Sequence, residues 1–184
     1  MKMLEICLKY TPLLVAVVGG MFALYQWSKS NSLKKARFLN SFIEKIRGDK
    51  DIVEILRYLD LNDSWYSIEF HDSDDESRQR FEQKMDKTLS YFSYICYLRE
   101  KRIITDKEFN FFNWHIKLIL KNPGIQDYFY HLYHYVTGKF QAKFQQQHLL
   151  DYGAKTHIID SDFFNPNAHL RNNKYTAHFD SWYA

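Results

Sequence analysis

The chain has 184 residues, of which 46% are hydrophobic and 26% are charged, and its formal net charge is +3. This composition excludes a disordered or collagen-like chain, and so mild a charge does not indicate a dedicated nucleic-acid binder. Six glycines and three prolines are few, which argues against an all-β sandwich and for long helices. Two cysteines, Cys7 and Cys96, exclude a disulfide framework and a zinc site built from cysteines.

The first predicted element is a membrane anchor over residues 1–30. Between Lys9 and Lys29 the chain has 19 residues without a charge, and aromatic residues bracket the run. As a helix, the apolar part from Pro12 to Trp27 would reach roughly 24 Å, just short of a bilayer core. A cleaved signal peptide and a buried core helix are the alternatives, although no small-residue cleavage site follows the run.

Flanking cations predict the orientation of this anchor. Two lysines precede the run and four cations follow it closely: Lys2 and Lys9 before, and Lys29, Lys34, Lys35 and Arg37 after. The positive-inside rule then predicts a single pass with the N-terminus outside and residues 31–184 in the cytoplasm. Unpaired cysteines fit a reducing compartment.

Small residues recur within the apolar run. Ala16 and Gly20 are four positions apart, and so are Gly19 and Ala23. Such spacing allows two membrane helices to approach closely, so it indicates self-association; incidental small residues are the alternative. A single span cannot enclose a channel, so a pore would require a ring of subunits.

Apolar residues at helical spacing continue beyond the anchor. They predict a helix over residues 33–46 that Gly48 ends, and a second helix over residues 51–61. Residues 62–75 are expected to form a loop. The next helix carries apolar positions from Phe81 to Cys96, and the acids near its start complement the helix dipole more plausibly than they bind a metal.

Two further helices are expected in the second half of the chain. Thr105 and Glu108 have the spacing of a capping box that opens a helix, and Asn122-Pro123-Gly124 ends it. Residues 127–150 are expected to form one last long helix. From residue 155 to residue 184 the periodicity is weak and turn residues are frequent, so this part is predicted to be irregular.

Candidates for chemistry are few in this sequence. Asp127, His131 and His134 would share one helix face and could grip a metal, but the aromatic residues around them favour packing. Cys96 is flanked by apolar residues and is expected to be an inert core thiol. No phosphate-binding glycine loop, GxSxG or HExxH motif is present. We therefore expect no cofactor and no metal.

One pair, Arg171 and His178, has the pattern Arg-x6-His. A histidine can move the proton of a ribose hydroxyl, and an arginine can hold the phosphate, as in a metal-independent ribonuclease. About one such pair is expected by chance from composition alone, so the pair by itself does not identify a nuclease.

Taken with that pair, the layout of the chain resembles the membrane-anchored accessory protein of type VI-B CRISPR systems. The shared features are a short N-terminal span, a cluster of basic residues directly after it, a compact aromatic-rich helical domain and an Arg-x6-His pattern near the end of the chain. The resemblance implies an all-α fold with a divergent HEPN-like domain in the bacterial inner membrane. It also implies an RNA-guided, RNA-targeting effector as the functional partner, and a pore that strengthens antiphage defence. The layout is also similar to that of a broad group of bacterial single-span helical proteins.

Two classes of function follow, with a third possibility beside them. The favoured class is a non-enzymatic ring of on the order of six to ten subunits, with polar positions such as Gln26, Ser28 and Asn31 meeting the aqueous path. Its alternative is a membrane-tethered ribonuclease that acts on RNA through Arg171 and His178 in a dimer. The third possibility is a simple anchor for a cytoplasmic partner.

Overall fold

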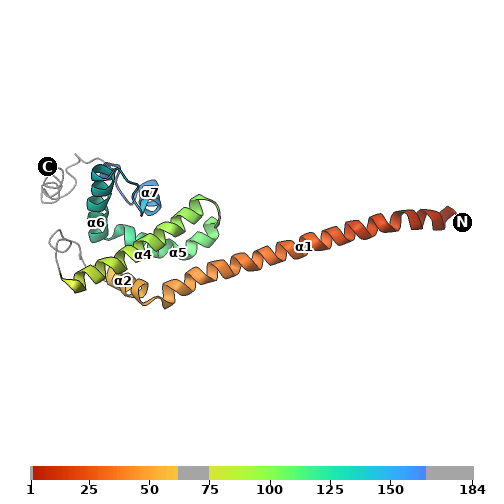
Figure 1. Ribbon diagram of the computed structural model, residues 1–184, viewed down its shortest axis with the longest axis horizontal. Helices are drawn as coiled ribbons and strands as arrows, with labels where there is room; N and C mark the ends of the chain where they lie inside the picture. Colours follow the sequence, from red (N-terminus) through yellow and green to blue (C-terminus); the bar gives the residue numbers. More distant parts are fainter. Residues whose placement is uncertain (1, 62–74, 165–184) are drawn as a thin grey trace. The chain divides into compact units, whose positions relative to one another are not determined.

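The computed structural model describes residues 2–61 and 75–164, and the side chains of residues 2–14, 139, 161 and 162 are not described. All regular structure in these ranges is helical, so the predicted all-α class is confirmed. The chain forms two compact units, residues 1–45 and 46–184. The elements in chain order are α1 (Lys2–Gly48), α2 (Lys50–Asp60), α4 (Glu76–Glu100), α5 (Asp106–Lys121), α6 (Pro123–His134), η1 (Tyr135–Lys139), α7 (Gln147–Lys155) and η2 (Ser161–Phe164). Figure 1 labels these α-helices.

Helix α1 is a single helix of 47 residues, so the predicted anchor and the helix expected over residues 33–46 are one continuous element. No break occurs at the expected boundary between residues 30 and 31. Of the helices in the described part of the chain, none is both long enough and apolar enough to cross a membrane. This finding leaves the predicted transmembrane span without structural support.

The second unit is built around α4, which packs against α2, α5 and α7. Along one side of α4, Met85, Leu89, Phe92 and Ile95 are completely buried. Helix α2 contributes a matching apolar face, with Ile52, Ile55, Leu56 and Leu59 buried. The burial of these apolar faces is the main stabilising contribution to this unit.

Side-chain caps fix where the helices begin. The predicted capping box is confirmed: the Thr105 side chain accepts a hydrogen bond from the Glu108 backbone, and the Glu108 carboxylate accepts one from the Thr105 backbone. Asp49 caps α2, Asp75 caps α4, and Asn122 caps α6 by accepting a hydrogen bond from the Ile125 N–H at 3.1 Å. Each cap satisfies a backbone donor that the first helical turn leaves unpaired.

The prediction of one long helix over residues 127–150 is wrong. Helix α6 ends at His134, a π-helical turn follows over Tyr135–Lys139, and α7 starts only at Gln147. Beyond the π-helical turn, Gln141 adopts the left-handed conformation with φ 50°, so the chain does not resume a helix there. Phe144 and Gln146 are buried in the segment before α7, so tertiary packing outweighs the helical propensity of this sequence.

Candidate functional sites

The small residues of the expected membrane segment lie in the described part of α1. Ala16, Gly19, Gly20 and Ala23 are all exposed, and a Cβ atom built on Gly19 or Gly20 would meet no heavy atom within 4 Å. A helix turns about 100° per residue, so these four positions fall within one face about 100° wide. The two predicted small-residue spacings therefore form one surface, which we call the small-residue face.

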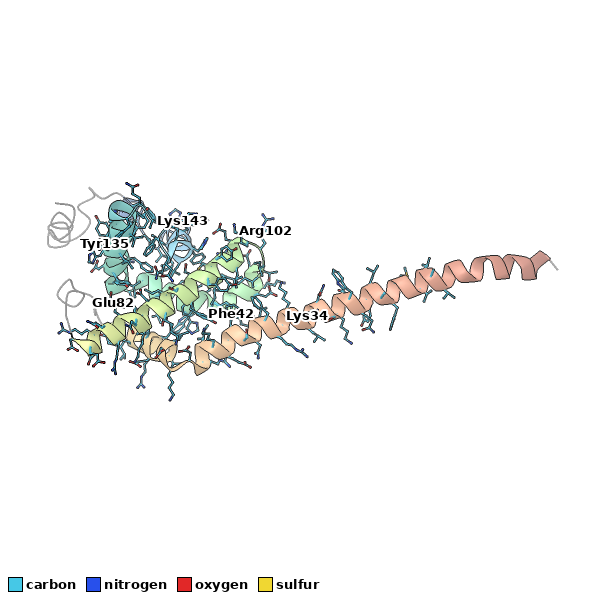
Figure 2. The ribbon with its side chains drawn as sticks, in the orientation of Figure 1. Lys34, Phe42, Glu82, Arg102, Tyr135 and Lys143 are labelled. Carbon is cyan, nitrogen blue, oxygen red and sulfur yellow. The ribbon has the colours of Figure 1, made fainter. Side chains whose placement is uncertain are left out.

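Large apolar side chains cover the rest of this segment. Figure 2 shows side chains projecting on several sides of α1 in this stretch. Eight large apolar residues between positions 15 and 27 are exposed, each by more than half of its surface: Val15, Val17, Val18, Met21, Phe22, Leu24, Tyr25 and Trp27. Exposed apolar surface on several sides of a helix is typical of a segment that contacts another helix, another protein or a membrane.

The polar positions expected to meet a pore do not all share one face of the helix. Gln26, Ser28 and Asn31 are all exposed on α1. Gln26 and Ser28 are two residues apart and therefore point about 200° away from each other around a straight helix. In a symmetric ring, one of the two positions could face the axis, but not both.

A polar cleft of about 750 Å³ lies in the second unit. It lies where the C-terminal end of α4 and the start of α5 meet α7, and Figure 2 marks Arg102 at the turn after α4. Its lining residues are mostly polar or charged: Cys96, Arg99, Glu100, Arg102, Ile104, Thr105, Asp106, His148, Asp151, Tyr152, Lys155 and Thr156.

The first polar pair of the cleft joins α4 to α7. His148 Nδ1 lies 2.9 Å from a Glu100 carboxylate oxygen, and the His148 ring lies 5.0 Å from that of Tyr97. This hydrogen bond from His148 is the main reason that the pKa of Glu100 is lowered. Because 48 residues separate the two side chains, no spacing rule could have found the pair.

The second polar pair is organised around Arg99. Its Nε donates a hydrogen bond to Asp106 at 2.8 Å, and its guanidinium lies 4.5 Å from the Phe109 ring centroid and 5.2 Å from that of Tyr152. Tyr152 in turn donates to the side-chain oxygen of Asn113 at 2.9 Å. Planar stacking on rings is what a guanidinium does well, so Arg99 ties α4, α5 and α7 together.

Cys96 lines the cleft and is 5% exposed. Burial raises its pKa to about 12. A thiol with that pKa carries almost no thiolate at neutral pH, and the thiolate is the reactive form. Cys96 is therefore a packing residue, in agreement with the expectation from its apolar neighbours.

The histidines of α6 pack instead of forming an open metal site. His131 and His134 are buried, and His134 Nε2 lies 3.0 Å from the Phe163 carbonyl oxygen, to which it donates. The rings of Tyr130, Tyr133 and Phe163 surround His134. Within residues 2–61 and 75–164, no group of three or more His, Cys, Asp or Glu side chains is placed to hold a metal ion.

Arg171 and His178, the candidate ribonuclease pair, lie outside the described residues. The cleft contains arginine, histidine and lysine, but its histidine and Arg99 already hold Glu100 and Asp106. What the cleft can do on this geometry is bind a polar ligand and join three helices. Comparison with family models, curated proteins and solved structures finds no match to this chain.

Proposed function

We propose that the protein is an oligomeric membrane protein whose α1 segment forms the intramembrane part of a pore. The observation that carries the proposal is the uncovered apolar segment from Val15 to Trp27, with the small-residue face along one side. The resemblance to the type VI-B accessory family adds an RNA-guided effector as functional partner and the bacterial inner membrane as location.

The shortness of the segment favours assembly over a lone span. The apolar part from Pro12 to Trp27 covers roughly 24 Å of a hydrocarbon core that is about 30 Å thick. A lone helix of this length would leave polar ends in lipid or thin the bilayer, whereas association is one of the accepted responses to such mismatch. Close packing through Gly19 and Gly20 gives neighbouring helices van der Waals contact. Such contact drives helix association in a bilayer, where the hydrophobic effect does not.

The test is the protein mass of the detergent-solubilised particle, by light scattering with the detergent contribution subtracted. We expect a particle of on the order of six to ten subunits. Gly20→Leu places a bulky side chain on the small-residue face and should dissociate the particle, while membrane insertion is retained. Val18→Leu adds bulk about 160° away around the helix and is the matched control, which should keep the particle intact.

The outcomes separate the functional classes. A ring-sized wild-type particle that Gly20→Leu dissociates and Val18→Leu does not supports the proposal. Efflux of a dye from vesicles should then fall with Gly20→Leu as well. A monomeric wild-type particle, or a particle indifferent to Gly20→Leu, overturns the assembly; a dimer redirects attention to Arg171 and His178.

A further inference from the structure

The outward side of α5 carries two large aromatic residues that are mostly exposed. Phe111 is 65% exposed and Trp114 is 60% exposed. The other side of α5 is committed to the core, since Phe109, Phe112 and Ile116 are almost fully buried. At 100° per residue Phe111 and Trp114 lie nearly opposite this buried stripe. Phe111 and Trp114 together form an exposed aromatic patch, and such patches are common at interaction sites.

Lysines surround these rings on the same side of the helix. With half-buried Leu118, the outward positions define what we call the lysine-aromatic face: Lys107, Phe111, Trp114, Lys117, Leu118 and Lys121. Helix α5 has only two acidic residues, and both are engaged with residues other than these lysines. Asp106 is held by Arg99 at 2.8 Å, and Glu108 is engaged by Thr105 in the capping box.

The chemistry of this face fits an anionic lipid surface. Tryptophan and phenylalanine prefer the boundary between headgroups and acyl chains, and lysine stems extend along apolar surface while their ammonium groups reach the phosphates. Each lysine near a negatively charged leaflet adds attraction that falls off within a Debye length. Proteins that bind single-stranded nucleic acid combine aromatic residues with a positively charged groove that follows the backbone. The exposed side of a single helix is convex and offers no such groove.

We infer that the lysine-aromatic face of α5 binds the surface of a bilayer that contains anionic phospholipid. Trp114 and Phe111 enter the headgroup region, and Lys107, Lys117 and Lys121 contact the phosphates. This contact is separate from insertion of α1: insertion does not depend on lipid charge, whereas the α5 contact does.

The experiment follows Trp114 in the full chain. Trp27→Phe, Trp65→Phe and Trp182→Phe leave Trp114 as the only tryptophan, and the protein is reconstituted with phosphatidylcholine vesicles brominated on the acyl chains near the headgroup. With phosphatidylglycerol included, bromine should quench Trp114 fluorescence at least about twofold, and high salt should abolish the quenching. Vesicles of phosphatidylcholine alone should give little quenching.

Charge reversal provides the matched pair of variants. Lys117→Glu/Lys121→Glu should weaken the dependence on phosphatidylglycerol by at least about tenfold. Lys50→Glu/Lys143→Glu changes the net charge equally at exposed positions elsewhere and should leave the quenching intact. Thermal melting by circular dichroism checks that both variants fold.

Failure of α1 insertion has its own signature: high salt would release the protein from both kinds of vesicle. Three other results would overturn the inference about α5. The first is equal quenching with and without phosphatidylglycerol. The second is shielding of Trp114 from aqueous acrylamide that rises with protein concentration and not with lipid, which would assign the face to a second copy of the chain. The third is shielding by single-stranded RNA alone, which would assign it to nucleic acid.

Discussion

Gly153 is a position where a single atom decides the packing of α7. A Cβ atom at this position would lie 2.8 Å from Ile159 Cδ1, 2.9 Å from Ile159 Cγ1 and 3.3 Å from Leu120 Cδ2. Both neighbours are buried, so they have little room to retreat. The Gly153 carbonyl also accepts backbone hydrogen bonds from Ile158 and Ile159, which fold the chain back over the end of the helix.

We therefore expect Gly153→Ala to lower the free energy of unfolding by about 1–3 kcal/mol, the usual cost of overpacking a core. Urea denaturation followed by circular dichroism measures this loss. The double variant Gly153→Ala/Ile159→Val removes one of the crowded carbons and should recover part of it. No loss with Gly153→Ala would show that Ile159 moves freely.

Two histidines make the stability of the second unit depend on pH. Burial lowers the pKa of His115 and of His134; for His134, the hydrogen bond to Phe163 opposes the shift without cancelling it. The folded state then binds fewer protons than the unfolded state below the ordinary histidine pKa of about 6.5. Stability is fully present above that pH and is lost as the pH falls toward the lowered folded-state values.

The corresponding measurement is the free energy of unfolding in urea between about pH 7 and about pH 5. We expect a decrease as the pH falls, and a smaller slope for His115→Gln, because that variant keeps a polar group of similar size without the titration. His157→Gln, at an exposed position, is the control for exchanging a histidine for glutamine outside the core. An unchanged slope in His115→Gln would show that other groups cause the pH dependence.

At the scale of elements, α4 and α7 end in the same way. Arg102 has φ 55° and His157 has φ 54°, and each lies just beyond its helix. In both cases the following residue donates a backbone hydrogen bond to the last turn: Ile103 to the Leu98 carbonyl and Ile158 to the Gly153 carbonyl. This is the left-handed ending that glycine adopts most readily, so both positions hold a strained residue.

His157→Gly should accordingly stabilise the protein by about 0.5–1 kcal/mol, since relief of the left-handed strain exceeds the added flexibility of the unfolded chain. Arg102→Gly should give a similar gain in stability if the guanidinium makes no stabilising contact in the cleft. A rise in the thermal midpoint measures either gain. A loss with Arg102→Gly alone would show that its side chain contributes to the cleft.

Elements with a local signal were predictable from the sequence. The Thr105–Glu108 box brings donors and acceptors together within one turn. Asn122-Pro123-Gly124 ends α5 as expected, but α6 begins at once at Pro123 and not at Asp127. The break between α6 and α7 was missed because it depends on Gln141 and on the burial of Phe144 against Phe129 and Tyr133. The cleft was missed for the same reason: Glu100 meets His148 across 48 residues, and periodicity carries no information at that distance.

At the scale of the whole molecule, the two compact units are stabilised in different ways. Unit 2 is held together by the buried face of α4, where the Phe92 ring is fully buried beside the rings of Tyr91 and His115. In unit 1 the described side chains, those of residues 15–45, belong to one helix and are mostly exposed, so among them no comparable core forms. Assembly through the small-residue face would therefore not require the core of unit 2.

Phe92→Ala tests this separation. Removing a fully buried ring should cost unit 2 about 3–5 kcal/mol and lower its thermal midpoint. The mass of the detergent particle should stay at the wild-type value, because the contacts proposed for assembly lie between Ala16 and Ala23 in the other unit. If Phe92→Ala dissociates the particle while α1 remains helical, subunit contacts lie in unit 2, and the small-residue face is not what holds the assembly together.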